Sequence, residues 1–519
     1  MLIGTNMKRW FNTAGPCQSD IHYMLPSLER LPSLERLIAQ RGYFVVHAPR
    51  QTGKTTAMLT LAQNLTATGR YAAVMVSAEV GAAYSSSPEK ANIAILKAWE
   101  DAIRYWLPAE LQPPDWSTCN SVGRALNLWA AQCSRPVILF IDEIDALQDD
   151  ALISVLRQLR DGYPRRPDGF PQALALIGLR DVRDYKVAAG GSRKLGSASP
   201  FNIKIESLTL RNFTQAEVKC LYGQHTADTG QAFTLGALRQ AYVLTQGQPW
   251  LVNALARQIT EEILQDSKTT VEIEHVNQAK EILIRRQDTH LDSLAERLRD
   301  PRVRAIIEPM LSGQVLENVS NEDIQFVLDL GLCVMRSEGG LAIANPIYQE
   351  VLPKVLTVVP MAAMPQISPV WLEPSGALNL DTLLQAFLQF WKQNGEPLLK
   401  SAPYHEIAPH LVMMAFLDRV VNGGGTLERE YALGSGRMDL RLCYGSVVLG
   451  IELKVWRDGR ADPLPAGLKQ LDSYLARLEI ALGWLVIFDQ RSGLLPIEQR
   501  VSVEVVRSPN ERVITVIRG

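Results

Sequence analysis

Cysteine and histidine are scarce in this sequence, with six and seven residues among 519. The cysteines stand at positions 17, 119, 133, 220, 333 and 443 and share no spacing typical of a metal site or a disulfide framework. The histidines likewise form no ligand constellation. Cysteines without such a framework are typical of a reducing compartment, so we expect a cytoplasmic protein.

An excess of charge of one sign is also absent. The 53 lysines and arginines balance 55 aspartates and glutamates to a net charge of −2. This balance gives no global nucleic-acid signature, so a surface that binds nucleic acid has to be local. Residues 355–372 carry no charge, but three prolines and Gln366 argue against a membrane span. We expect a linker there, at 359–375, and no membrane partner.

A lysine-containing loop follows an apolar segment near the start of the chain. Residues 43–47 predict a strand, and a helix is expected through about Thr66. The loop between them comprises Ala48, Pro49, Arg50, Gln51, Thr52, Gly53, Lys54, Thr55 and Thr56. Backbone N–H groups and the positive helix end of such a P-loop hold phosphates. Lys54 is expected to reach the β- and γ-phosphates of ATP, and the Thr55 hydroxyl to ligate Mg²⁺.

A second element of the same site follows downstream. Residues 137–141 form an all-apolar run, as a buried parallel strand requires, and end at Asp142 and Glu143. An acid at the carboxyl end of such a strand meets the nucleotide. We expect Asp142 to hold Mg²⁺ through water and Glu143 to activate the attacking water. A third apolar strand, 173–178, ends near Arg180, where a sensor group is expected.

Residues 205–310 predict helices, and 311–358 predict a winged-helix element. The segment Gly247-Gln248-Pro249 begins a helix, either as a plain helix start with proline at its first position or as part of a nucleotide lid. In the predicted winged-helix element, a helix over 321–330 ends at Gly331, and a hairpin joins the strands 332–335 and 341–344. Asn345 caps a last helix. Such an element either contacts DNA or packs against the lid.

Together these features resemble the AAA-like bacterial ATPases of the STAND or archaeal-ATPase type over residues 1–360. The resemblance implies that residues 11–16 lie near the nucleotide base and that Pro249 lies near adenine. It also implies a homo-oligomer in which an arginine from a neighbouring subunit completes the site. The candidates for that arginine are Arg157, Arg160, Arg180 and Arg183.

The hexamer Leu-Pro-Ser-Leu-Glu-Arg occurs twice in tandem, at 25–30 and 31–36. Two copies do not make a solenoid. We interpret them as a local duplication without catalytic meaning.

The C-terminal part contains a hairpin that carries opposed acids. Residues 437–444 and 447–455 predict strands joined by Gly445-Ser446, a two-residue turn. Asp439 then lies opposite Glu452. Side chains that face each other in this way lie about 5 Å apart, where like charges are destabilising. We therefore expect a cation between them, and oxygen ligands favour Mg²⁺ or Mn²⁺.

Lys454 projects from the same face as Glu452, while Ile451 and Leu453 point into the core. Two carboxylates, a hard cation and an ammonium group are the parts needed for metal-assisted phosphodiester hydrolysis.

This pattern resembles the active site of the PD-(D/E)xK nuclease superfamily over roughly residues 376–519, which implies an α/β restriction-endonuclease-like fold. Asp439, Glu452 and Lys454 match its D…E-x-K motif, and Gln470 and Tyr474 match its downstream Q-x-x-x-Y. Glu406 stands where many members carry a further glutamate. Met438 replaces the proline expected before the aspartate, which touches no metal ligand.

We therefore expect an α/β protein with five parts. They are a P-loop ATPase domain (1–204), a helical lid (205–310), a winged-helix element (311–358), a linker (359–375) and a nuclease-like domain (376–519). Three functions compete: an ATP-controlled nuclease, a regulator whose C-terminal domain binds nucleic acid without cutting it, and a motor that cuts as it moves. The absence of extra translocase elements favours a switch, with DNA favoured over RNA as the partner.

Overall fold

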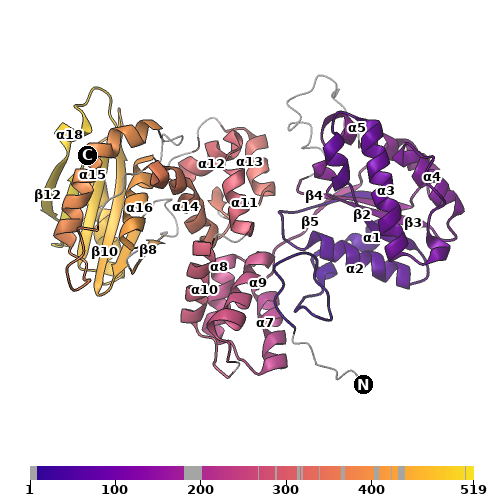
Figure 1. The fold of residues 1–519 in the computed structure, drawn as a ribbon, viewed down its shortest axis with the longest axis horizontal. Coiled ribbons are helices and arrows are strands. Elements are labelled where there is room, and N and C mark those ends of the chain that lie inside the picture. Colours follow the sequence, from indigo (N-terminus) through magenta and orange to yellow (C-terminus); the bar gives the residue numbers. More distant parts are fainter. Residues whose placement is uncertain are drawn as a thin grey trace. The chain divides into compact units, whose positions relative to one another are not determined.

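The computed structural model describes residues 9–180, 201–266, 268–286, 289–311, 316, 319–337, 339–363, 369–401, 408–421, 424–430, 439–508 and 510–519. Contacts within the chain divide it into two compact units (Figure 1). The first comprises Met1–His290 with Ile324–Ile347, and the second comprises Leu291–Asp323 with Tyr348–Gly519.

The first unit is built on a five-stranded parallel sheet with the order β2-β3-β4-β1-β5. Its strands are β1 (Tyr43–His47), β2 (Ala72–Ser77), β3 (Val137–Asp142), β4 (Ala173–Gly178) and β5 (Glu206–Thr209). Every residue of β3 and β4 is buried, which explains their unbroken apolar sequences. The three strands predicted from sequence are confirmed.

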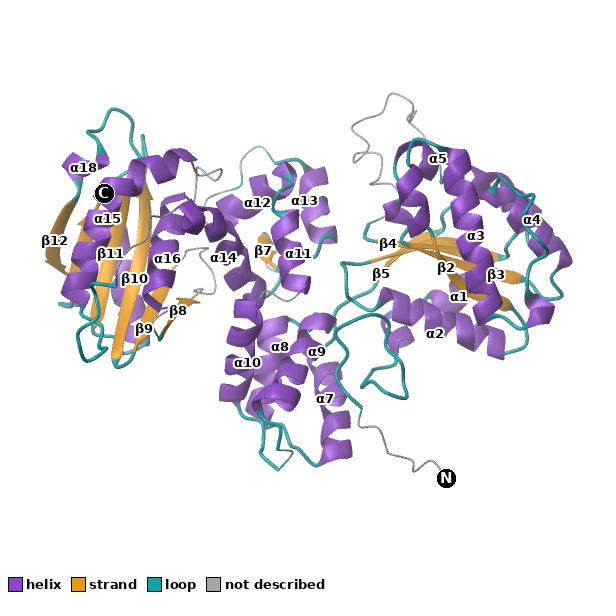
Figure 2. Ribbon diagram, in the orientation of Figure 1, coloured by secondary structure: helices purple, strands orange, loops and turns teal. Residues whose placement is uncertain are grey.

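Helices cover both faces of this sheet (Figure 2). Alternate strand residues face opposite sides, so Val45 and Leu139 belong to one core and Phe44 and Ile138 to the other. The first core is closed by α3 (Pro88–Trp106), α4 (Val122–Gln132) and α5 (Asp149–Gly162). The second is closed by α1 (Leu34–Ala39) and α2 (Lys54–Ala67). This layering leaves the carboxyl ends of β1 and β3 open to form a site.

A helical region follows the sheet in the first unit, as predicted. It comprises α7 (Gln215–Thr229), α8 (Leu235–Thr245), α9 (Pro249–Arg257) and α10 (Ile273–Arg286). Thr214 and Glu217 form a capping box at the start of α7. Gln248 caps α9 by accepting a hydrogen bond from the Leu251 amide. The predicted helix start at Pro249 is therefore confirmed.

Two further helices, α11 (Thr289–Arg297) and α12 (Pro301–Leu311), lie in the segment predicted to be helical. The elements expected of a winged helix follow along the chain: α13 (Asn321–Asp329), β6 (Cys333–Met335), β7 (Leu341–Ile343) and α14 (Pro346–Ala363). Gly331, with φ +71°, ends α13, and Cys333 pairs with Ile343 in the hairpin. Helix α14 continues to Ala363 and so extends into the segment predicted as a linker. Among the described residues, no helix has the length and apolar character needed to cross a membrane.

The second unit contains a six-stranded mixed sheet with the order β12-β13-β11-β10-β9-β8. Its strands are β8 (Gly425–Glu430), β9 (Asp439–Tyr444), β10 (Val447–Trp456), β11 (Leu482–Asp489), β12 (Ser502–Arg507) and β13 (Val513–Arg518). One face packs on α15 (Leu380–Ser401), α16 (Ala408–Val421) and the short α18 (Ile497–Arg500). The other face packs on α17 (Leu464–Arg477).

The predicted hairpin has the predicted register. Tyr444 pairs with Val447 and Asp439 pairs with Glu452 in the antiparallel ladder of β9 and β10. Ile451 and Leu453 belong to the core on the α15 side. Glu452 therefore faces α17, which carries Gln470 and Tyr474.

Gly247 offers a test of the turn before α9. Its φ is +69°, and a Cβ atom there would collide with the carbonyl oxygen of Phe213. We expect Gly247→Ala to lower the free energy of unfolding by clearly more than about 1 kcal/mol, because left-handed strain adds to a backbone clash. Gly230→Ala is the matched control, since Gly230 has φ +80° with no atom within 4 Å. Equal losses in the two variants, measured by denaturant unfolding, would contradict this prediction.

Candidate nucleotide site and candidate metal centre

The P-loop lies between the end of β1 and the start of α2. Gln51 and Gly53 adopt left-handed backbone conformations, with φ of 59° and 92°. Alternating backbone conformations of this kind turn successive N–H groups into an anion-binding concavity. The Lys54 ammonium donates hydrogen bonds to the carbonyls of Ala48 (2.8 Å) and Pro49 (2.9 Å). Burial lowers the pKa of Lys54. The negative charges of Asp142, Asp145 and Glu143 act in the opposite direction and stabilise its protonated form.

The predicted Mg²⁺-binding pair is brought together. The Thr55 hydroxyl donates a hydrogen bond of 2.8 Å to Asp142, which lies at the end of β3. Asp142 is buried, and this burial raises its pKa. The Thr55 hydroxyl on α2 and the Asp142 carboxylate on β3 are hard oxygen ligands that lie within 3 Å of each other, so these residues fit Mg²⁺.

Glu143 follows Asp142 with φ 53°, a left-handed conformation that is rare outside glycine and is concentrated at functional sites. Its amide donates a hydrogen bond of 2.9 Å to the Asp142 carboxylate. Burial, followed by the charge of Asp142, raises the pKa of Glu143. A carboxylate with a raised pKa at the cavity wall is suited to accept a proton from water.

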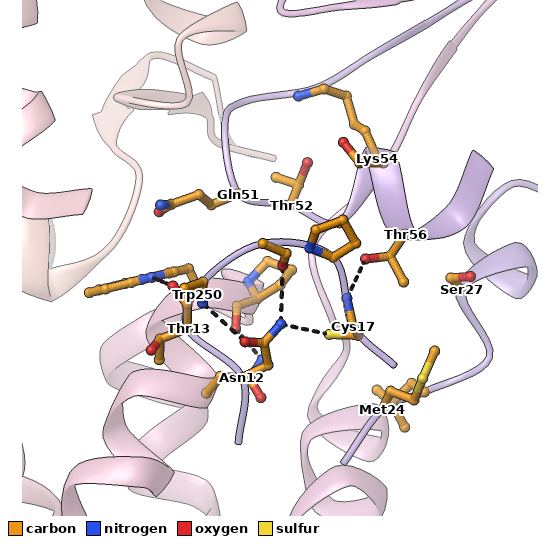
Figure 3. A pocket seen from close by; sticks show the side chains of 18 of the residues that line it. Asn12, Thr13, Cys17, Met24, Ser27, Gln51, Thr52, Lys54, Thr56 and Trp250 are labelled. Atoms are coloured by element: carbon orange, nitrogen blue, oxygen red, sulfur yellow. Dashed lines mark hydrogen bonds between the residues drawn. The ribbon is translucent and has the colours of Figure 1, made fainter. Parts of the chain in front are cut away.

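A cavity of about 450 Å³ opens beside the P-loop (Figure 3). This volume is within the range of about 300–1,000 Å³ that small-molecule sites occupy. Its walls come from the P-loop, from Glu143, from the N-terminal residues and from α9. Figure 3 shows Lys54, Thr52 and Gln51 on one side of the cavity and Asn12, Thr13 and Trp250 on another.

The N-terminal strap, residues 9–26, connects the sheet domain to the helical region around this cavity. The Cys17 amide donates a hydrogen bond of 3.1 Å to the Thr56 hydroxyl on α2. The Trp250 indole on α9 donates one of 2.9 Å to the Thr13 carbonyl, and Arg257 donates one of 2.8 Å to the Thr13 hydroxyl. A nucleotide in the cavity would therefore contact both domains and the strap.

Sequence reasoning found part of this cavity. Residues 12–16 and Pro249 line it, where the family resemblance places the nucleotide base. The residues it missed include Tyr23, Met24, Ser27, Arg30, Phe213, Trp250 and Asn253. No motif marks them as ligand-binding residues, and only the hexamer repeat drew attention to the segment that contains Ser27 and Arg30.

The candidate arginines for a shared site have different surroundings. Arg157 and Arg160 are exposed on α5. The Arg180 guanidinium lies 4.6 Å from the ring centre of Phe326 in the same chain. Arg183 lies outside the described residues, and a contribution from a second subunit stays a prediction.

In the second unit, Glu452, Lys454 and Gln470 are brought together. Lys454 forms an ion pair with Glu452 and donates a hydrogen bond of 2.8 Å to the Gln470 side-chain oxygen. Glu452 is fully buried, and the side chain of Lys454 is 13% exposed. Strand β10 and helix α17 thus present one carboxylate, one ammonium and one amide to a common point.

Tyr474 lies one turn beyond Gln470 on α17 and is buried against β10. Gly450 makes this close packing feasible, because a Cβ atom there would lie 3.1 Å from the Tyr474 ring and 2.7 Å from Leu475. On another side of α17, the buried Asp472 accepts hydrogen bonds from Ser508 (2.8 Å) and Arg512 (2.7 Å). These contacts hold α17 at a defined position on the sheet.

The remaining predicted ligands are described only in part. The backbone of Asp439 lies opposite Glu452, but its side chain lies outside the described part of the chain, as do Met438 and Glu406. Among the described residues, no group of three His, Cys, Asp or Glu side chains could hold a metal ion. That search covers one of the three predicted carboxylates, so the metal centre stays a prediction.

Comparison with protein-family models and with curated proteins finds no match. Among solved structures, a Walker-type ATPase of Pyrococcus abyssi is similar at 12% identity and a TM-score of 0.47, covering 66% of this chain and 99% of that one. The Thermotoga maritima RuvB Holliday junction branch migration motor is similar at 15% identity and a TM-score of 0.33, covering 62% and 92%. The Aeropyrum pernix ORC1 protein in complex with DNA is similar at 15% and 0.33, covering 65% and 94%.

These scores are too low to carry a function from one protein to another. The fold of the first unit follows from its own geometry: a five-stranded parallel sheet, a P-loop after β1, and an acid after β3 hydrogen-bonded to the P-loop threonine. The first unit therefore has a P-loop fold built on an AAA-like parallel sheet, and the second unit has a mixed six-stranded sheet.

Two substitutions test the nucleotide site. We expect Lys54→Ala to weaken ATP binding by about 10–100-fold, because a charged hydrogen bond contributes roughly 1.5–3 kcal/mol. Glu143→Gln should keep the ATP affinity and stop hydrolysis, since it removes only the proton acceptor. Calorimetry measures the first effect and phosphate release the second. Lys90→Ala, at an exposed position on α3, is the control. Unchanged ATP affinity in Lys54→Ala would refute the site.

Proposed function

We propose that this protein is an ATP-binding and ATP-hydrolysing switch that controls a metal-dependent nuclease. The substrate bond is a phosphodiester, in DNA rather than in RNA. One observation carries the proposal: Lys454 is held between Glu452 and Gln470, with Asp439 opposite Glu452, in a chain that also contains a P-loop with a paired acid.

The ATPase half is supported by the groups that line the cavity and by Asp142, which is hydrogen-bonded to one of them, Thr55. Lys54 and the loop amides would bind phosphates, Thr55 and Asp142 would bind Mg²⁺, and Glu143 would accept a proton from the attacking water. Burial raises the pKa of both acids and lowers that of Lys54, so bound Mg²⁺ and phosphate would stabilise the charged forms of all three.

In the nuclease half, we assign roles to the residues that match the nuclease motif. Asp439 and Glu452 would hold Mg²⁺ or Mn²⁺, with Glu406 as a third carboxylate. The ion, when bound, lowers the pKa of a coordinated water and polarises the scissile phosphate. Lys454 would stabilise the negative charge that develops on the phosphoryl oxygens. Gln470 fixes the Lys454 ammonium through its 2.8 Å hydrogen bond, and Tyr474 lies one turn away on the same helix.

A regulator that binds nucleic acid without cutting it is the second candidate. The ion pair favours it, because Lys454 already neutralises the buried Glu452 carboxylate without a metal. Removal of a metal ligand distinguishes the two functions, since only the nuclease requires one.

Cleavage of labelled DNA and RNA with Mg²⁺ or Mn²⁺, with and without ATP, tests the nuclease half. We expect Asp439→Asn to abolish cleavage while ATP hydrolysis and fold stay intact, because it removes a charge and almost no volume. Lys454→Ala should cut about 10²–10³-fold more slowly, the usual cost of losing one such electrostatic contact. Lys469→Ala, at an exposed neighbouring position on α17, should cut normally.

If Asp439→Asn cuts as fast as the unchanged protein, the assigned centre is wrong. If the unchanged protein cuts no nucleic acid in any nucleotide state but binds it, the regulator is the better account.

A further inference from the structure

The two copies of the repeated hexamer have different surroundings. The first copy ends at Arg30, which is 6% exposed and lines the nucleotide cavity. The second ends at Arg36, whose side chain is 51% exposed and pairs with Glu206 at 2.6 Å on the surface. The same six residues therefore supply one buried arginine and one solvated arginine, which allows a matched comparison.

The buried Arg30 is held by neutral groups. Its guanidinium donates hydrogen bonds to the carbonyls of Arg211 (2.9 Å) and Thr52 (2.8 Å), and it lies 4.8 Å from the ring centre of Phe213. Its Nε atom has no hydrogen-bond partner among the described residues. Glu217 is near enough for its charge to raise the pKa of Arg30. Its carboxylate, however, accepts hydrogen bonds from both terminal nitrogens of the Arg211 guanidinium, at 2.6 and 2.9 Å.

A buried cation without an opposite charge is costly, because burial removes its hydration. Burial lowers the pKa of Arg30 to about 10, so the guanidinium still carries its charge at neutral pH. Such charges are normally paired. In the described part of the chain no carboxylate forms an ion pair with Arg30, while the cavity it lines is the one assigned to an anionic nucleotide.

We propose that Arg30 is a positioning residue of the nucleotide site and that the phosphates of the bound nucleotide balance its buried charge. This inference rests on the ATP site of the proposed function. It gives the first copy of the hexamer a role that the second copy does not share.

The contact with Thr52 explains how Arg30 would act on the P-loop. In a planar trans peptide the C=O and the following N–H point in opposite directions. Because the Thr52 carbonyl points at Arg30, the Gly53 amide points away from it. A Cβ atom on Gly53 would lie only 3.1 Å from the Arg30 guanidinium, so the loop and the cation are in close contact. Arg30 thus fixes the orientation of the Thr52–Gly53 peptide in the P-loop.

The test compares ATP with adenosine, which lacks the phosphates. We expect Arg30→Gln to weaken ATP binding by about tenfold or more, because the phosphates lose the buried positive charge that they balance, and to change adenosine binding by less than about twofold. Arg30→Lys keeps the charge and should bind ATP within about threefold of the unchanged protein. Arg36→Gln is the control and should bind both ligands normally.

Each outcome is decisive. Equal ATP binding by Arg30→Gln and the unchanged protein overturns the inference, as does an equal loss for ATP and adenosine, which would indicate a purely structural role. If Arg30→Gln lacks a cooperative thermal transition, Arg30→Lys decides: a loss of ATP binding as large as that of Lys54→Ala, despite the retained charge, overturns it. Failure of the unchanged protein to bind ATP would instead refute the proposed function.

Discussion

Charge that is buried at a sheet has to be balanced, and this constraint applies in both halves of the protein. Asp142 is buried at the end of β3 and is hydrogen-bonded to Thr55, while Glu452 is fully buried in β10 and is paired with Lys454. In surroundings of low polarity such groups interact strongly with ions and phosphates, and they are costly when left alone. In the proposed function, a nucleotide with Mg²⁺ in the first unit and a metal ion in the second would complete this balance.

The walls of the cavity suggest how nucleotide binding would affect the rest of the first unit. The cavity is enclosed by the P-loop, by α9 and by the N-terminal strap, and the strap is hydrogen-bonded to Thr56 on one side and to Trp250 on the other. A ligand that contacts all three walls stabilises the arrangement in which they are close together. If the cavity binds a nucleotide as proposed, the strap would respond to whether it is filled.

Sequence reasoning succeeded where local patterns determine structure. The strand before the P-loop follows from a run of apolar residues, and the register of β9 and β10 follows from the Gly445-Ser446 turn. It did not place Ser27, Arg30 or Trp250 at the cavity, because these positions depend on packing between segments far apart in the chain. Arg30 and Arg36 have identical local sequences and opposite surroundings, which no local pattern can distinguish.

In the proposed function the nucleotide state controls the C-terminal centre, and DNA cleavage by two variants of the nucleotide site tests this control. Cleavage of labelled DNA would be followed in Mg²⁺ for Glu143→Gln, expected to bind ATP without hydrolysing it, and for Lys54→Ala, expected to bind it weakly, at an ATP concentration that fills only the first. We expect cleavage rates that differ by about tenfold or more with ATP, a typical coupling between two sites, and equal rates without ATP. Equal rates in the presence of ATP would contradict it.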